Sequence, residues 1–461
     1  MIETSSTPRK IVLATFGSLG DLHPFVALAK GLQARGHEPI VATSEYHREL
    51  IERQHIGFFP VRPELLEFAE RPEIFRLLMD RNRGTAAVIK QVFLPHLRDS
   101  FDDLMRAVEG ADLLVTHTIA FAGPLVAEVS GVPWVSALLA PMALFSKYDP
   151  PVPPQAAWLR HLHPLGPRFF GPLLRVARRV VYPWGEPVRQ LRRELGLPPG
   201  DDPLFEGANS PDCVLALFSS ALGSPQPDWP SQTLQTGFAF FDDANANGIS
   251  DELARFLDTG PPPIVFTLGS SAVMDAGSFY QESLAAARRV GRRAVLLIGD
   301  DPRNQPTEPL RDDAIAIDYA PFSEIFPRAA AVVHQGGVGT TGQALRAGRP
   351  MLVVPWSHDQ YDNAERVRRL GVAQMLEKTR YRAARVATAL GRLFEDPAYA
   401  VRARQVGEQL RDEDGVRAAV EAMLSCERRI ATKNQSHCDR GLNKCSRGRP
   451  SVNQAFQHDE T

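Results

Sequence analysis

The chain has 461 residues, and at about 150 residues per domain this length suggests two or three domains. Apolar residues make up 44% and charged residues 23% of the sequence, which is ordinary for a globular protein and excludes a largely disordered chain. The net charge of −2 gives no basic footprint for nucleic acid.

Other compositional features point to a cytoplasmic protein without metal or membrane segment. Four cysteines, none in a C-x-x-C pair, cannot form a disulfide scaffold, and no His cluster has zinc spacing. The N-terminus is polar and leads directly into a strand, so it does not resemble a secretory signal. The longest apolar stretch, Val132–Phe145, is shorter than the ~18 residues that span a membrane.

The first half of the chain begins as a βαβ unit, which predicts a parallel sheet. The β-rich run Lys10–Phe16 is followed by a glycine turn at Gly17–Gly20, a helical pattern over Pro24–Arg35 and a strand over Glu38–Thr43. Further elements predicted in this half are the strands Asp112–Thr116 and Val132–Leu138 and the helix Pro124–Ser130.

A second cycle of strands and helices starts at Pro263–Leu268. It continues with helices at Ser278–Val290 and Thr340–Ala347 and strands at Arg293–Ile298, Ala314–Ile317, Ala330–His334 and Pro350–Pro355. The alternation predicts an α/β protein of two Rossmann-like, doubly wound domains facing each other across a cleft.

Composition shifts predict the domain boundaries. We expect a first Rossmann-like domain over 1–240, a Gly-, Pro- and Asp-rich linker over 241–263, a second Rossmann-like domain over 264–425 and a polar, disordered tail over 426–461. The Pro-, Arg- and aromatic-rich segment Tyr148–Trp184 is either a basic amphipathic surface that touches a membrane or an insertion that walls an acceptor pocket, and the second interpretation is favoured.

The densest chemical signal is the segment His334–Gly342, which follows a strand and opens a helix. Its glycines let the backbone approach a ligand, and the helix N-terminus favours a diphosphate. The spacing Gly337-x-Gly339-x-x-Gly342, with Asp359 further on, also matches the dinucleotide fingerprint. An NAD(P)-dependent oxidoreductase is therefore an alternative.

The wider pattern resembles the donor-binding signature of the UDP-glycosyltransferase superfamily, inverting enzymes of the GT-B fold (glycosyltransferase family 1). The His358–Asn363 continuation and the turn Gly17–Pro24 are similar to the bacterial branch that contains antibiotic and macrolide glycosyltransferases and the B subunit of rhamnosyltransferase. The segments that carry the resemblance are Tyr319–Phe322, His334–Thr341, Leu345–Pro350 and Val354–Gln360, within a loose similarity over residues 10 to 425.

The resemblance implies that the domain over 1–240 binds the acceptor and that the domain over 264–425 binds the nucleotide sugar. It also implies a role for each residue that matches the signature. Tyr319 and Phe322 would meet the nucleotide base, and Asp359 and Gln360 would hold the sugar hydroxyls, although Asp359 could also be a plain helix N-cap. The residues implied to surround the diphosphate are Ser270, Ser271, His334, Gly336, Gly337, Gly339 and Thr340.

One departure from the family pattern bears on the nucleotide. UDP-specific members carry a Glu that bonds the ribose hydroxyls in the helix after the glycines, and here that position is Gly342. A site that does not bond a hydroxyl gains little discrimination from it. The sequence therefore favours a dTDP-deoxysugar, with dTDP-rhamnose as the leading candidate and UDP-glucose as the alternative.

The acceptor hydroxyl needs a general base. Where many family members have a His after the first strand, this sequence has Asp21, and where they have its Asp partner, it has His117. We hypothesise that Asp21 is the base, paired with His117, and that His23 is a rival base. His117 could also be an ordinary core histidine.

The implied enzyme is an inverting, metal-independent glycosyltransferase without a cofactor, because the nucleotide sugar is a co-substrate. Its other partner would be a small hydrophobic acceptor with a hydroxyl, such as a polyphenol or flavonoid, a macrolide or a hydroxy-lipid. A nucleotide-sugar epimerase and a non-catalytic auxiliary protein of a partner transferase are further alternatives. The sequence leaves open whether the protein is a monomer or a weak homodimer.

Overall fold

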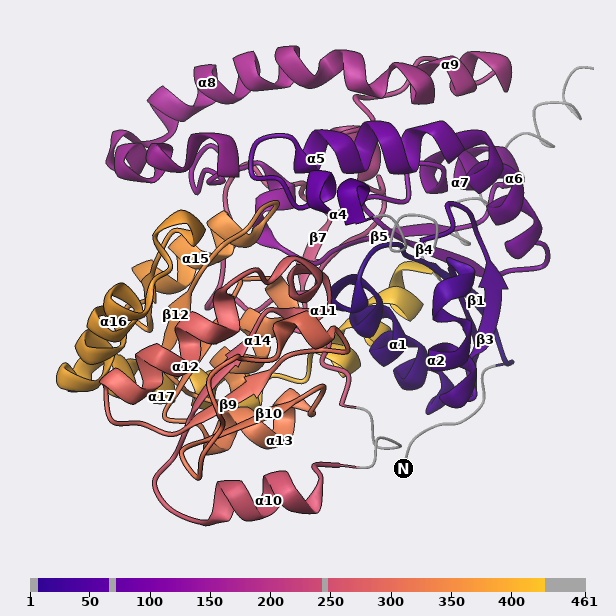
Figure 1. The fold of residues 1–461 in the computed structure, drawn as a ribbon. Helices are drawn as coiled ribbons and strands as arrows, with labels where there is room; N and C mark the ends of the chain where they lie inside the picture. Colours follow the sequence, from indigo (N-terminus) through magenta and orange to yellow (C-terminus); the bar gives the residue numbers. More distant parts are fainter. Residues whose placement is uncertain (1–6, 66–71, 243–247, 428–461) are drawn as a thin grey trace, which may run out of the picture.

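The computed structural model describes residues 7–65, 72–242 and 248–427, and it contains two parallel β-sheets, one in each half of the chain. Helices cover both sheets (Figure 1). The predicted α/β class with two doubly wound sheets is confirmed.

The first sheet has seven strands in the order β3-β2-β1-β4-β5-β6-β7, and all of its pairs are parallel. The strand order reverses between β1 and β4, and ligands of open α/β sheets bind beyond the carboxyl ends of strands at such a point. The strands are β1 Lys10–Ala14, β2 Glu38–Thr43, β3 Gly57–Pro60, β4 Leu113–His117, β5 Trp134–Leu138, β6 Val214–Ala216 and β7 Thr233–Gln235.

The helices of this half pack on both faces of the sheet. The α-helices are α1 Leu19–Gln33, α2 Arg48–Arg53, α4 Pro72–Leu78, α5 Gly84–Ala87, α6 Leu97–Ala107, α7 Gly123–Ser130, α8 Gly166–Val181 and α9 Glu186–Glu194. Shorter or irregular helical segments are η1 Glu45–His47, η2 Val88–Phe93, η3 Leu94–His96, η4 Pro141–Leu144, η5 Pro154–Leu165, η6 Tyr182–Gly185 and η7 Glu206–Ala208.

The second sheet has six parallel strands in the order β10-β9-β8-β11-β12-β13, with its own switch point between β8 and β11. The strands are β8 Ile264–Thr267, β9 Ala294–Leu297, β10 Ala314–Ile317, β11 Ala331–His334, β12 Met351–Val353 and β13 Ala373–Met375. The helical segments are α10 Asp251–Asp258, α11 Gly269–Ala272, η8 Val273–Asp275, α12 Phe279–Arg289, η9 Pro302–Asn304, α13 Phe322–Ile325, η10 Phe326–Arg328, α14 Val338–Arg346, α15 Gln360–Arg369, η11 Lys378–Arg380, α16 Ala383–Glu395 and α17 Pro397–Asp412.

The structure corrects the predicted start of the first helix. We expected it to begin at Pro24, but α1 begins at Leu19 and contains Pro24. The reason is a capping box: the Ser18 side chain accepts a hydrogen bond from Gly20 N–H, and the Asp21 carboxylate accepts one from Ser18 N–H. These bonds stabilise a helical turn ahead of the proline.

Helices lie at both of the predicted domain boundaries. The segment 241–263, predicted as a linker, contains α10, whose Leu253 and Leu257 are buried in a hydrophobic cluster that includes residues of both halves. A helix over 415–427 returns to the first half, where Val416 and Val420 pack on Gly31 of α1. Figure 1 shows this last, yellow helix beside α1. The predicted tail began at 426, but the helix continues to 427; residues 428–461 lie outside the described part.

The two halves are joined by a buried ion network. Arg366 of α15 is 2% exposed and forms ion pairs with Asp362 on its own helix and with Asp149 of the first half. Asp362 also accepts a hydrogen bond of 2.9 Å from Val152 N–H. Burial alone would raise the pKa of Asp149, but the charges of Arg366 and Arg369 keep it lowered. This network fixes α15 against the first half.

Within residues 7–65, 72–242 and 248–427, every helix is too short or too polar to cross a bilayer.

Candidate active site

Three helix N-termini converge where the two sheets face each other. Helix α1 lies beside both α11 and α14. A Cβ atom placed on Gly339, in the first turn of α14, would be 3.8 Å from Gly20 Cα, in the first turn of α1. Helix N-termini present free N–H groups and a positive dipole, so this arrangement suits an anionic ligand such as a diphosphate.

The glycine loop before α14 has no room for a side chain at Gly336. Gly336 has φ +94°, and a Cβ there would be 3.0 Å from the carbonyl oxygen of Gln360. Gly337 is the N-cap of α14 and provides no side-chain cap. The first N–H groups of α14 are therefore not satisfied by a capping side chain, which leaves them for a ligand. Thr340 lies in the same turn and is 7% exposed.

His334 is oriented differently from our expectation. We predicted that it donates to the diphosphate, but its side chain is fully buried. Its Nδ1 accepts a hydrogen bond of 3.1 Å from Gly336 N–H, and its Nε2 lies 3.3 Å from Met351 Sδ. Burial lowers the pKa of His334 to about 3, so the ring is neutral. In this structure His334 supports the glycine loop rather than reaching into the cleft.

Gln335 is a polar residue of this site that the sequence analysis did not single out. It is 4% exposed, and its Oε1 is buried without a hydrogen-bond partner among the described residues. Its Nε2 lies 2.4 Å from the position of a Cβ on Gly269 and 2.9 Å from that of a Cβ on Gly337. The amide therefore fills the space between α11 and α14. The Oγ1 of Thr341 is also buried without a partner.

The other predicted donor-binding residues of the second half differ in their exposure. Ser270 and Ser271 lie in α11, the first exposed and the second half-buried. Tyr319 follows β10 and is 63% exposed, as a residue that stacks on an incoming base must be. Phe322 instead packs on the core, stacked on Phe326 with the ring centroids 4.5 Å apart.

Gln360 and Asp359 stand at the start of α15. Gln360 Oε1 accepts hydrogen bonds of 2.8 Å from Trp356 N–H and 3.1 Å from Ser357 N–H, so it holds the loop before the helix. Asp359 occupies the N-cap position but makes no capping bond. Its Oδ2 accepts 2.7 Å from Asn363 Nδ2, which also donates 3.0 Å to the Gly336 carbonyl. Asn363, which the sequence analysis did not assign, thus connects Asp359 to the glycine loop.

The first half of the chain contacts the loop that precedes α15. His358 has φ +55°, and its Nδ1 lies 3.2 Å from Thr85 Oγ1 of α5. Burial lowers the pKa of His358 to about 4. The neutral ring therefore connects α5 to the loop that carries Asp359 and Gln360.

Asp21 lies at the N-terminus of α1. Its Oδ2 accepts hydrogen bonds of 2.9 Å from Ser18 N–H and 3.1 Å from Ser18 Oγ. Burial between the domains raises the pKa of Asp21 to about 6, although the bonds from Ser18 oppose the shift. An isolated Asp is a weak base at neutral pH, and this shift brings Asp21 close to the range that general bases need.

Asp359 faces Asp21 across the cleft. Burial raises the pKa of Asp359 to about 7, and the charges of Asp21 and Asp362 add to the shift while the bond from Asn363 opposes it. Both residues keep part of their surface accessible. Two interacting carboxyl groups with raised pKa values can share roles, one as a base and one as a hydrogen-bond donor.

The two candidate histidines are not placed as the catalytic hypothesis required. His117 ends β4 and is bonded to the backbone of Phe16, just before the turn that carries Asp21, rather than to the Asp21 carboxylate. Burial lowers its pKa to about 4. His23 packs on Phe241 with the ring centroids 5.2 Å apart, and two residues along a helix place it about 200° around α1 from Asp21.

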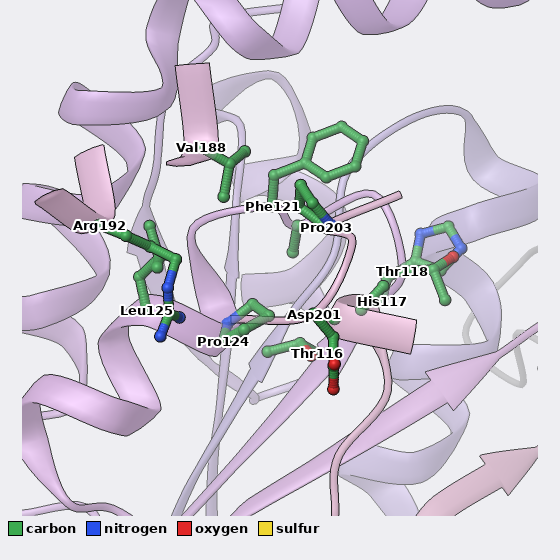
Figure 2. Close-up of a pocket in the computed structure, with 13 residues that line it drawn as sticks. Thr116, His117, Thr118, Phe121, Pro124, Leu125, Val188, Arg192, Asp201 and Pro203 are labelled. Atoms are coloured by element: carbon green, nitrogen blue, oxygen red, sulfur yellow. The ribbon is translucent and has the colours of Figure 1, made fainter. Parts of the chain in front are cut away.

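A pocket lies next to His117 at the carboxyl end of β4 (Figure 2). His117 Nδ1 is buried there without a hydrogen-bond partner. Phe121, Leu125 and Val188 give the pocket apolar walls, while Thr118 and Asp201 supply polar groups. Its volume is about 40 Å³, well below the roughly 300 to 1,000 Å³ of ligand pockets, so it has room for a small chemical group rather than a whole substrate.

The packing of the Phe238 ring explains why residue 342 is a glycine. A Cβ at Gly342 would lie 3.0 to 3.2 Å from three carbons of the Phe238 ring, which is 7% exposed. The ring thus occupies the space into which a longer side chain at residue 342 would extend.

A metal ion in a protein is held by a cluster of ligating side chains. In the described parts of the chain, no three His, Cys, Asp or Glu side chains gather in a way that could hold a metal ion.

Comparisons with known proteins agree with this geometry. The family model of the glycosyltransferase family 28 N-terminal domain matches residues 11–135, and that of the erythromycin biosynthesis protein CIII-like C-terminal domain matches residues 281–419. The O-mycaminosyltylonolide 6-deoxyallosyltransferase of Streptomyces fradiae is 34% identical over 89% of this chain and 96% of its own length. The chain therefore belongs to the GT-B UDP-glycosyltransferase family of antibiotic glycosyltransferases, and it is an enzyme of the glycosyltransferase class.

More distant relatives include a sterol 3-beta-glucosyltransferase of Emericella nidulans, 28% identical over 90% of this chain but only 30% of the relative's length. Among solved structures, the glycosyltransferase of kitacinnamycin has a TM-score of 0.70 at 19% identity, covering 91% of this chain and all of that one. The calicheamicin glycosyltransferase CalG4 has a TM-score of 0.68 at 18% identity, covering 92% of this chain and all of that one. These likenesses confirm the predicted GT-B fold.

Proposed function

We propose that the protein is an inverting glycosyltransferase that moves a sugar from a nucleotide diphosphate sugar, preferably a dTDP-deoxysugar such as dTDP-rhamnose, to a hydroxyl of a small hydrophobic acceptor. The observation that carries this proposal is the position of Asp21. Its carboxylate, with a pKa raised to about 6, lies where the N-termini of α1, α11 and α14 converge.

The proposed reaction is a direct displacement. The acceptor oxygen attacks the anomeric carbon, the bond from that carbon to the diphosphate oxygen breaks, and Asp21 takes the acceptor's proton. Displacement from the opposite side inverts the anomeric configuration. The N–H groups at the start of α14 and α11 stabilise the negative charge of the leaving diphosphate, so we propose that no metal ion is needed.

The acceptor would enter from the first half of the chain. We propose a small, largely apolar acceptor, such as a macrolide, a polyphenol or a hydroxy-lipid. The pocket beside His117, with a volume of about 40 Å³, has room for only a small group of such a molecule. The relatives' names mention both a macrolide derivative and sterols as acceptors. Asp359 and Gln360 would hold the donor sugar, and Tyr319 would stack on the base.

The preference for dTDP is supported by Phe238. Its ring fills the space next to Gly342, so no carboxylate can reach a ribose hydroxyl from that position. Among solved structures of the same fold, the glycosyltransferase VinC and the spinosyn rhamnosyltransferase SpnG were determined with thymidine diphosphate.

A thermal-shift titration with dTDP, UDP and NAD tests the donor class. A ligand at 100 times its dissociation constant stabilises the protein by about 2.7 kcal/mol. We expect the largest shift with dTDP, a smaller one with UDP and none with NAD. A response to NAD alone would contradict a nucleotide-sugar site.

Turnover with dTDP-rhamnose and UDP-glucose over a panel of hydroxylated acceptors then tests transfer itself. The expected product has the inverted anomeric configuration by NMR, and EDTA leaves the rate unchanged. The double variant F238A/G342E makes room for a carboxylate, and we expect it to shift the preference toward UDP-sugars. An unchanged preference would remove the argument from Gly342.

A further inference from the structure

Helix α8, Gly166–Val181, is largely unpartnered. It lies with α9 along the outer edge of the first half (Figure 1). Of its 16 residues, Phe170 alone has a buried side chain. The helix belongs to the segment Tyr148–Trp184, which the sequence analysis favoured as a wall of the acceptor pocket. With one buried side chain in four turns, α8 presents most of its surface outward.

The outward surface of α8 is ordered into an apolar stripe. At about 100° per residue, Leu165, Phe169, Val176 and Val180 fall within about 60° of one another around the helix. Their exposed fractions are 54%, 38%, 56% and 68%. The residues that face the protein, Phe170, Leu174 and Val181, fall on the opposite side. A soluble helix normally buries its apolar stripe, and here a second stripe is left in solvent.

A basic stripe runs beside the apolar one. Arg168, Arg175 and Arg179 fall at about 280° to 320° on the same count from Leu165, next to the apolar residues. All three are exposed, and no ion pair of the described residues involves them, whereas Arg178 pairs with Glu206. The sequence has no Asp or Glu from Pro150 to Gly185. Nothing acidic on this helix offsets the charge.

Exposed aromatic side chains flank the helix. Trp158 precedes it in η5 and is 61% exposed, and Tyr182 follows it directly and is 51% exposed. We call the stripe residues, the three arginines and Tyr182, which directly follows the helix, the outer face of α8. Apolar and cationic side chains on one surface helix, with an exposed aromatic side chain at its end, are a combination that binds the headgroup region of a bilayer.

We propose that the outer face of α8 docks on a lipid surface that carries anionic headgroups. The charge pattern selects this occupant over two others. A second copy of the chain would bring the two arginine rows together. The segment 428–461 has seven Lys and Arg against three Asp and Glu, so it is also basic. The helix lies in the interface plane and does not cross the bilayer, so docking is reversible and depends on salt.

Vesicle co-sedimentation of the full chain tests this proposal. The probes are vesicles of phosphatidylcholine alone and vesicles that also contain phosphatidylglycerol. We expect binding to the anionic vesicles, little binding to the neutral ones, and release when the salt concentration is raised. A protein that ignores both kinds of vesicle, or self-associates through α8 instead, overturns the proposal.

Matched variants assign the binding to α8. R168E/R175E/R179E should reduce the partition into anionic vesicles at least tenfold, and V176S/V180S should reduce it by a smaller factor. The control R53E/R289E/R385E makes the same change in net charge at exposed arginines elsewhere, and it should bind like the parent. Equal losses in both triple variants would mean that only net charge matters and would overturn the assignment to α8. Unchanged melting temperatures and turnover with a soluble acceptor verify that each variant is folded.

Discussion

The two strand-to-helix turns before α1 and before α14 differ in what their side chains offer to the first N–H groups of the helix that follows. At the start of α1, Ser18 and Asp21 form a capping box, so the chain brings its own carboxylate to the positive end of the helix. At the start of α14, Gly337 is the N-cap and offers no side chain. One turn is closed by an anion that belongs to the protein, and the other, the open turn, carries no anion of its own. The difference teaches how one fold element can hold the proposed base in one place and remain available to the proposed leaving diphosphate in another.

Removing the negative charge from the closed turn should have the largest effect. Asp21→Asn keeps an oxygen that accepts from Ser18 N–H, so the cap survives while the base is lost. We expect kcat to fall by about 10² to 10⁴, the range of general-base catalysis, with dTDP affinity unchanged. Steady-state kinetics and the thermal shift with dTDP check both parts.

Ser18→Ala is the matched control for that variant. It removes the cap hydroxyl, at a cost of about 1 kcal/mol, and leaves the Asp21 carboxylate in place. Its turnover at pH 8 should stay within about tenfold of the parent, well above Asp21→Asn. If the two variants lose activity equally, Asp21 acts by capping α1 and not as a base.

Closing the open turn is the converse experiment. Gly337→Asp gives α14 a side-chain cap and an anion of its own, and its φ of −58° suits a non-glycine residue. We expect dTDP affinity to fall by about ten- to hundredfold, while the unfolding free energy rises by about a few tenths of a kcal/mol. Calorimetric titration and thermal melting check the two effects.

Gly337→Ala separates charge from bulk. It adds a Cβ that meets only the flexible Gln335 amide, at 2.9 Å, and it should retain most of the affinity. An affinity loss as large as that of Gly337→Asp would show that space, not the unsatisfied N–H groups, determines binding.

The dependence of kcat/KM on pH tests the environment of Asp21 in the closed turn. Because the pKa of Asp21 is raised to about 6, kcat/KM should fall about tenfold per pH unit below about pH 6. The Ser18 hydroxyl stabilises the ionised carboxylate, so Ser18→Ala should move this acid limb to higher pH. A limb that stays near pH 4 in both proteins would contradict burial of Asp21.

The smallest expected effect is on stability. The pKa of Asp359 is raised to about 7 in the folded protein, so ionising this carboxyl destabilises the fold increasingly as pH rises from about 4 toward 7. Asp359→Asn should therefore melt above the parent at pH 8 and close to it at pH 4. A variant that melts below the parent at pH 8 would show that the ionised form is stabilised instead.

Much of the fold could be predicted from the sequence. The β2 strand Glu38–Thr43 and the β10 strand Ala314–Ile317 were predicted with their observed bounds, since short apolar runs between turn residues are typical of buried parallel strands. The start of α1 was missed because Pro24 was given more weight than the S-x-x-D capping pattern at Ser18, which was visible in the sequence.

The site was predicted less completely, because motif positions do not give side-chain direction. His334 stands where a donor ligand was expected, but its ring turns inward to Gly336, and His117 bonds the backbone of Phe16 instead of Asp21. Gln335 and Asn363 are positioned by contacts between segments that are far apart in the chain. The raised pKa of Asp359 depends on burial between two domains, which a single sequence does not reveal.

The helix over 415–427 has a practical consequence for building hybrid enzymes. It follows the second sheet in sequence, yet its residues Ala419, Val420 and Met423 belong to the core around α1. A hybrid that joins this chain to a relative at one crossover would therefore pair α1 with a foreign helix. Two crossovers, one before β8 and one before residue 415, would keep each core with its own parts. Recombination between such genes should accordingly favour exchange of the middle segment over exchange of the whole second half.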